Sequence, residues 1–160
     1  MNEMQHLIQR NLPALKKQFK DRMGYELNLS NPVTIAEKFN WLKVYDSTFI
    51  KTLCADKIRV HDYVKRMLGK DICVPILKIY DTVPTKFPNF KECVIKCNHG
   101  SGMNIIVTNN RYDIPSICSK LKTWLNTTYL HLYEFHYAPI EKKMFYRTIC
   151  WYKQLYTKGL

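Results

Sequence analysis

The stretch Val94-Ile95-Lys96-Cys97-Asn98-His99-Gly100-Ser101-Gly102-Met103-Asn104-Ile105-Ile106-Val107 decides the fold of this chain. β-Branched residues on both sides of a Gly-Ser-Gly turn predict two short strands, at residues 92–97 and 104–108. Lys96 leaves the first strand directly into the turn. A Walker-type phosphate loop instead has its lysine after the glycines and continues into a helix, and the Rossmann glycine pattern is absent. The stretch therefore predicts a β-hairpin with a flexible glycine tip.

Two interpretations of this hairpin are open from the residues alone. Phosphate binding needs a fixed cation and convergent backbone N–H groups, and glycine lets the backbone come close to a ligand. The alternative is an ordinary hairpin turn with Lys96 on its solvent face. Spacing alone slightly favours the ordinary turn, because glycine and serine are common turn residues.

Helical patterns precede the hairpin. Apolar residues from Leu7 to Phe19 recur at helical spacing, and Pro13 predicts a break or restart. Thr34-Ile35-Ala36-Glu37 has the pattern of a capping box. The helix that it opens is expected to end near Tyr45 and to turn four apolar residues toward a core: Ile35, Phe39, Leu42 and Val44.

The remaining elements follow from caps and prolines. Asp56 is predicted to cap a second helix that ends at Gly69, and Pro75 places the apolar run 72–80 at a sheet edge or strand start. Asp113 is predicted to cap a helix with Pro115 in its first turn. No convincing pattern begins at Met144. Helices first, followed by a hairpin and another helix, predict an α+β fold rather than a doubly wound parallel sheet.

Composition narrows the function only a little. The 160 residues include 25 Lys and Arg against 13 Asp and Glu, giving a formal charge of +12, which fits a polyanionic partner. The basic residues are scattered, however, and no RNA-binding aromatic signature or paired Cys/His finger is present. No two of the six cysteines have C-x-x-C spacing, and we expect all six to be reduced. No apolar run is long enough for a membrane span and no signal peptide begins the chain, so we expect a cytoplasmic location.

Five ordered blocks resemble the TupA-like ATP-grasp family, which is named after a teichuronopeptide-biosynthesis protein. The first, Asn31-Pro-Val-Thr-Ile-Ala-Glu-Lys-Phe-Asn-Trp-Leu-Lys-Val-Tyr-Asp46, is similar to the opening signature of that family. The others follow in the family's order: Cys54 to Val64, Pro75 to Asp81, Val94 to Gly102, and Tyr133 to Tyr137. Ordered blocks are far more specific than any one of them.

The resemblance implies an ATP site. Asp56-Lys57 matches the Asp-Lys pair whose lysine contacts nucleotide phosphate in ATP-grasp enzymes, and Lys96 matches the second phosphate lysine. The flexible loop that closes over the phosphates corresponds to Asn98, His99, Gly100, Ser101 and Gly102. His99 could equally stabilise the turn. Glu134 and His136 match a block whose role the sequence leaves open, and a structural aromatic cluster is the simpler interpretation.

The resemblance also divides the chain. Residues 1–45 are expected to form a helical N-terminal segment, residues 46–143 a partial ATP-grasp nucleotide-binding region, and residues 144–160 a divergent tail. ATP-grasp enzymes hold Mg²⁺ through acidic and amide residues in a second half, but no acidic residue follows Glu141, so no metal ligand or catalytic residue is assigned. Our hypothesis is that a frameshift truncated a longer enzyme, which would leave weak nucleotide binding and no ligase turnover.

The function that the resemblance implies is the ATP-binding part of a carboxylate–amine ligase of cell-surface polysaccharide biosynthesis. Such enzymes transfer the γ-phosphate of ATP to a carboxylate, and an amine then attacks the acylphosphate. One alternative is a small basic nucleic-acid-binding protein. The net charge and the tyrosines favour this alternative, whereas the scattered positions of the lysines and arginines count against it. Another is a glycosyltransferase-like protein of the same biosynthesis, against which the lack of an Asp-x-Asp motif counts. The acceptor and the oligomeric state are left open.

Overall fold

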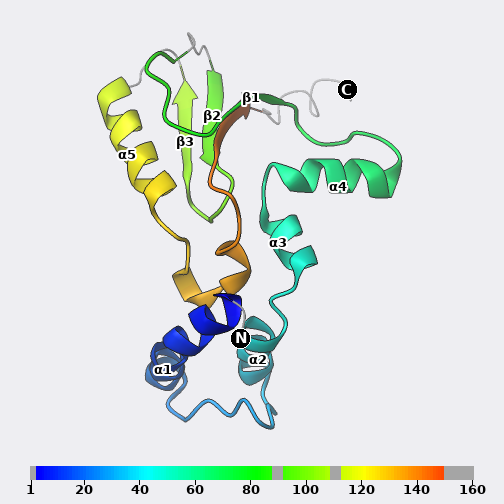
Figure 1. The fold of residues 1–160 in the computed structure, drawn as a ribbon, viewed down its shortest axis with the longest axis vertical. Coiled ribbons are helices and arrows are strands. Elements are labelled where there is room, and N and C mark those ends of the chain that lie inside the picture. Colours follow the sequence, from blue (N-terminus) through cyan, green and yellow to red (C-terminus); the bar gives the residue numbers. More distant parts are fainter. Residues whose placement is uncertain (1–2, 88–91, 109–112, 150–160) are drawn as a thin grey trace, which may run out of the picture.

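The structure is a computed structural model that describes residues 3–87, 92–108 and 113–149. The elements in chain order are α1 (Glu3–Met23), α2 (Ile35–Tyr45), α3 (Phe49–Ala55), α4 (Arg59–Leu68), β1 (Ile76–Tyr80), β2 (Glu92–Cys97), β3 (Asn104–Thr108), α5 (Ile114–Asn126), η1 (His131–Tyr133), η2 (Phe135–Tyr137) and β4 (Met144–Thr148). Within the described residues the protein is α+β, with α1 and α2 at one end and a four-stranded antiparallel sheet, flanked by α5, at the other (Figure 1).

The sheet has the order β1-β4-β2-β3, and every neighbouring pair is antiparallel. β2 and β3 have the bounds that the sequence predicts, and residues 98–103 connect them. β1 begins directly after Pro75 and lies at an edge of the sheet, as predicted. Proline has no backbone N–H to donate to a neighbouring strand, which restricts it to such positions. The sequence pattern predicted no element at residues 144–148, yet β4 is an inner strand between β1 and β2.

One face of the sheet packs against α5. Side chains alternate between the two faces of a strand, and Cys93, Ile95 and Cys97 of β2 all turn to this side, where they are at most 2% exposed. They pack with Ile117 and Leu121 of α5 in one buried cluster. Asp113 caps α5, because its carboxylate accepts the Ser116 backbone N–H at 3.2 Å, as the sequence predicts.

A second core holds the helical end together. η2 contacts α1, α2 and α3, and its Phe135 is completely buried. Ile8, Leu15 and Phe19 of α1 pack into the same cluster. The predicted break at Pro13 is wrong, since α1 runs through it without interruption. Proline removes one helical hydrogen bond, but the buried apolar face on both sides of Pro13 outweighs that loss.

The capping box of α2 is confirmed, and of its four predicted core residues only Val44 is buried. Thr34 accepts the Glu37 backbone N–H, while the Glu37 carboxylate accepts the backbone N–H groups of Thr34 and Val33 at 2.8 and 3.0 Å. These bonds turn the Glu37 side of α2 inward. The opposite side is therefore exposed, and its three apolar residues do not reach a core: Ile35 is 75% exposed, Phe39 60% and Leu42 38%.

The helix predicted to follow Asp56 is present, with Arg59 as its first residue. Asp56 ends a short helix, α3, that the sequence pattern did not predict, and the next helix, α4, begins at Arg59. The Asp56 carboxylate accepts the backbone N–H groups of Ile58 and Arg59 at 2.9 and 3.3 Å. The backbone carbonyl of Asp56 also accepts the Val60 N–H at 2.9 Å, so Asp56 caps the turn that opens α4, as the sequence predicts. α4 ends at Gly69, which has a left-handed conformation as predicted.

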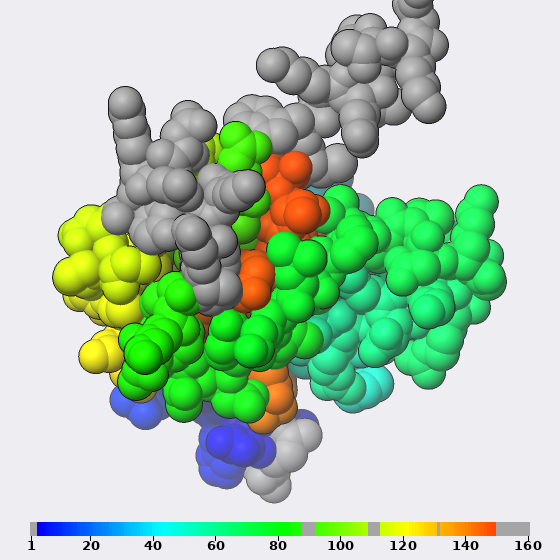
Figure 2. All heavy atoms as spheres, turned by 90° about the horizontal axis from the view of Figure 1, so that it is seen from above, coloured from blue at the N-terminus to red at the C-terminus, as the bar shows by residue number. Residues whose placement is uncertain are grey.

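α4 is the least buried helix of the fold. None of its residues is buried, and its part of the chain stands out as a lobe on one side of the space-filling view (Figure 2). Within residues 3–87, 92–108 and 113–149, no helix combines the length and the apolar character that crossing a bilayer requires.

Candidate functional site

The loop between β2 and β3 is closed by its own backbone. The Cys97 N–H donates to the Met103 carbonyl at 3.1 Å, and the Asn104 N–H donates to the Gly102 carbonyl at 2.9 Å. Gly102 has a φ of +74°, a conformation that glycine adopts without steric cost. Ser101 and Gly102 are exposed, whereas Asn98, His99 and Gly100 are buried. The loop therefore has a fixed base and a solvent-exposed tip.

Asn98 joins three separate segments at the base of the loop. It is 1% exposed. Its amide nitrogen Nδ2 donates to Asp56 Oδ1 at 3.1 Å and to the Glu141 carbonyl at 2.9 Å, while its Oδ1 accepts the Lys143 backbone N–H at 2.8 Å. The Asn98 N–H also donates to the Lys143 carbonyl at 3.1 Å. These bonds tie the loop to the turn before α4 and to the approach to β4.

Lys57, the residue after Asp56, also bonds to this loop. Its backbone N–H donates to the Asn98 carbonyl at 3.3 Å. Its ammonium group Nζ donates to the Asn98 carbonyl at 3.2 Å and also to the Gly100 carbonyl. Burial, and secondly the nearby charge of Lys96, lower the pKa of Lys57. In this structure Lys57 is thus a clamp on the loop backbone.

Lys96 lies on the sheet face opposite α5. It alternates along β2 with the buried residues Ile95 and Cys97, and its cross-strand partners are Asn104 on β3 and Phe145 on β4. Its side chain is half-buried. Burial, and secondly the charge of Arg147, lower the pKa of Lys96. A partly desolvated cation of this kind is a favourable partner for an anionic ligand.

His99 is buried at the base of the loop. It is 1% exposed, and its Nε2 lies 3.0 Å from the Trp124 carbonyl at the end of α5, so Nε2 donates there. Burial is the main cause that lowers the pKa of His99 below its ordinary value of 6.5. The ring is therefore kept neutral in the folded protein at neutral pH. This geometry favours the turn-stabilising role over phosphate contact.

The pKa of His99 makes the stability of the fold pH-dependent. Because the folded-state pKa lies below 6.5, the unfolded chain binds more protons once the pH falls below that value. The free energy of unfolding should therefore decrease as the pH is lowered from 7.5 to 5.5. Urea denaturation of His99→Gln at both values should show a smaller decrease than the wild type. Part of the decrease should remain, since burial also lowers the pKa of His136.

The matched control for this experiment is His6→Gln, because His6 is an exposed residue of α1. It should retain the pH dependence of the wild type. An unchanged pH dependence in His99→Gln would contradict the role assigned to the buried ring.

Gly100 fits the loop because it has no side chain. A Cβ atom at this position would lie 2.7 Å from Cδ2 and 2.9 Å from Cγ of Tyr129, and 3.0 Å from Sδ of Met103. The Tyr129 ring also packs edge-on against Tyr137, with 5.0 Å between the ring centroids. The glycine is thus required by the close approach of an aromatic side chain from the segment after α5.

The structure brings most of the predicted site residues together. Lys57 and the loop base are in direct contact, Lys96 lies close enough to affect the pKa of Lys57, and Ser101 and Gly102 form the tip. Sequence reasoning missed Tyr129, the backbone of Lys143, and Arg147. No local signal marks them, since each reaches the site only through the tertiary fold.

Glu134 and His136 lie away from the loop, next to the second core. His136 stacks in a tilted arrangement on Tyr137, with 4.7 Å between the ring centroids. The charge of Glu134 opposes the effect of burial on the pKa of His136, which is lowered overall. The pair belongs to the aromatic segment around η2.

The described residues do not supply a magnesium site. Within residues 3–87, 92–108 and 113–149, no three His, Cys, Asp or Glu side chains come together in a way that could hold a metal ion. The acidic group nearest the loop, Asp56, already accepts hydrogen bonds from Asn98 and two backbone N–H groups. The residues present therefore do not fit Mg²⁺, and we derive no step through it.

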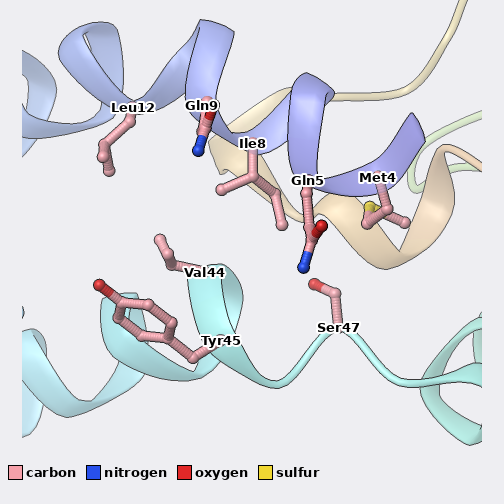
Figure 3. A pocket seen from close by; sticks show the side chains of 8 residues that line it. All are labelled: Met4, Gln5, Ile8, Gln9, Leu12, Val44, Tyr45 and Ser47. Atoms are coloured by element: carbon pink, nitrogen blue, oxygen red, sulfur yellow. The ribbon is translucent and has the colours of Figure 1, made fainter. Parts of the chain in front are cut away.

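A separate cavity of about 620 Å³ lies between α1 and the end of α2 (Figure 3). Figure 3 shows Ile8 and Val44 facing each other across it, with Gln5 directed toward Ser47. The lining has no charged side chain: Met4, Gln5, Ile8, Gln9, Leu12, Val44, Tyr45 and Ser47. It lacks the cations that phosphate requires and contains none of the predicted site residues.

The fold and the site together define an α+β protein in which a lysine-bearing strand leads into a clamped glycine loop on an antiparallel sheet. A comparison with protein families finds that the model of the TupA-like ATPgrasp family matches residues 37–150. The chain therefore belongs to the TupA-like ATP-grasp family, as its sequence blocks indicate. Searches of curated proteins and of solved structures return no match.

Proposed function

We propose that this protein binds ATP by its phosphate groups at the sheet face that carries Lys96, next to the glycine loop. The observation that carries the proposal is the half-buried Lys96 beside a loop whose backbone is fixed by Lys57 and Asn98. A fixed cation and a rigid loop base reduce the ordering that a triphosphate would otherwise require on binding. Membership in an ATP-grasp family supports the same ligand.

The two predicted phosphate lysines would have different roles. Lys96 presents its ammonium group from a strand, and no loop carbonyl accepts from it among the described hydrogen bonds. Lys57 is engaged with the carbonyls of Asn98 and Gly100, so a direct phosphate contact would have to replace one of these bonds. Lys57 therefore serves mainly to hold the loop, while Ser101 and Gly102 at its exposed tip are placed to close over a bound nucleotide.

The wider activity is also part of the proposal. The chain would contribute ATP binding to a carboxylate–amine ligase of cell-surface polysaccharide biosynthesis, acting in the cytoplasm. In such chemistry the γ-phosphate moves from ATP to a carboxylate oxygen, and an amine then displaces phosphate. Charge neutralisation by lysine and exclusion of water by a closing loop are the contributions that this part of the chain could make.

ATP binding to the purified chain tests the proposal. Titration calorimetry should show measurable, weak binding by the wild type and about tenfold or more weaker binding by Lys96→Ala, the loss typical of one charge-assisted hydrogen bond. The matched control is Lys120→Ala, an exposed lysine of α5 on the other side of the sheet. Indistinguishable ATP binding by Lys96→Ala and the wild type would contradict the assigned phosphate site.

A further inference from the structure

Strand register places Arg147 next to Lys96. Arg147 of β4 pairs with Val94 of β2, and the next pair on the same face is Phe145 with Lys96. Paired residues of neighbouring antiparallel strands have their side chains on the same face of the sheet. Lys96 and Arg147 are therefore diagonal neighbours on the face opposite α5, within reach of long side chains. Arg147, like Lys96, is half-buried.

Within residues 3–87, 92–108 and 113–149, neither Lys96 nor Arg147 takes part in an ion pair, and neither does Lys57. The positive charge of Arg147 also contributes to the lowered pKa of Lys96. The two positive charges thus repel each other in the ligand-free protein.

A bound polyanion would stabilise these two neighbouring cations more than a ligand with a single negative charge. Like charges held close together are unfavourable, and a ligand with several negative charges would relieve the repulsion while pairing each cation. The guanidinium group of arginine matches two phosphate oxygens at once, which a lysine ammonium group does not. Lys57 already donates to loop carbonyls, whereas no hydrogen bond from Lys96 or Arg147 to a loop carbonyl is found among the described residues.

We propose that Arg147 binds the polyphosphate of the nucleotide together with Lys96, so that the site selects ligands by the number of phosphate charges. This inference rests on the proposed ATP site and adds a residue that the five sequence blocks do not contain. The shared chemistry is that of a linear polyphosphate. Affinity should therefore decrease from ATP to ADP to AMP, and inorganic tripolyphosphate should bind at the same place.

The test is calorimetric titration of the full chain with ATP, AMP and inorganic tripolyphosphate. Arg147→Gln should weaken ATP and tripolyphosphate binding about tenfold. It should change AMP binding much less, because a single phosphate group makes fewer contacts with the two cations. The matched control is Lys78→Gln, which removes the same charge. Lys78 pairs with Tyr146, whose side chain is in the core against α5, so it lies on the opposite face of the sheet. It should leave all three affinities unchanged.

The outcomes separate this inference from the proposed function. Equal polyphosphate affinities for Arg147→Gln and Lys78→Gln would overturn the role of Arg147 while leaving the ATP site intact. Arg147-dependent binding of tripolyphosphate with no preference for ATP would support the cation pair and overturn the nucleotide site. No binding of either ligand by the wild type would overturn both. Should Arg147→Gln not fold, Arg147→Lys decides: about threefold weaker ATP binding supports the two-oxygen contact, and unchanged binding overturns it.

Discussion

Replacing Asn98 by alanine should lower the free energy of unfolding by about 3–5 kcal/mol, the range expected when several buried polar groups lose their partner together. The side-chain amide of Asn98 donates to Asp56 Oδ1 and to the Glu141 carbonyl and accepts the Lys143 N–H, and the residue is 1% exposed. Alanine can replace none of these bonds, and the enclosed site limits access of water to the groups left behind. Urea denaturation followed by circular dichroism measures the change.

The matched control is Asn126→Ala. Asn126 also donates from its side chain to a backbone carbonyl, that of Lys122, at 3.0 Å, but it is exposed at the end of α5. Water can replace that bond, so the cost should stay within about 0.5 kcal/mol. Equal costs for the two variants would contradict the view that Asn98 holds the loop, the turn before α4 and the approach to β4 together.

Gly100→Ala should destabilise the fold by about 1–3 kcal/mol, the usual cost of inserting a methyl group into a filled space. The added Cβ would meet Cδ2 and Cγ of the Tyr129 ring at 2.7 and 2.9 Å. The ring itself is braced by Tyr137, which limits how far it can move. Thermal unfolding of the variant measures the cost. The same variant should weaken ATP binding if the loop base must keep its position for the ligand.

A double-mutant cycle identifies the cause of this cost. In a Tyr129→Ala background the space beside Gly100 is open, so Gly100→Ala should then cost much less than in the wild type. Gly102→Ala provides the comparison, because Gly102 has no atom within 4 Å of the added Cβ and a φ of +74°. Its cost should come from backbone conformation alone and should not depend on Tyr129. An unchanged cost of Gly100→Ala without the Tyr129 ring would show that the close contact does not cause the destabilisation.

Several elements were predictable because their signals are local. Thr34 and Glu37 are three residues apart, and a capping box needs only that spacing together with the types of the two residues. Asp113 caps α5 for a similar reason. β2 and β3 were predicted with their observed bounds, since β-branched residues on both sides of a short glycine turn pair with each other without help from the rest of the chain.

Other predictions failed where distant contacts outweighed local patterns. Pro13 reads as a helix break, but residues on both sides of it pack into one core, so α1 continues. Ile35 and Phe39 read as a core face, but the bonded carboxylate of Glu37 turns the other side of α2 inward. β4 has no recognisable pattern, because an inner strand is defined by the strands on each side of it and both of these lie far away in the sequence.

The sequence by itself determined the family, the strand–loop–strand unit that carries Lys96, and the set of residues from which a phosphate site could be built. The contacts that each of them makes are set by the tertiary structure. Lys57 bonds to carbonyls of the loop, Asn98 and His99 are hydrogen-bonded at the loop base, and Arg147 lies beside Lys96. The physical reason is the insertion of β4 between β1 and β2. That insertion brings residues 141–147 against a loop more than forty positions earlier, and spacing along a chain carries no record of such long-range register.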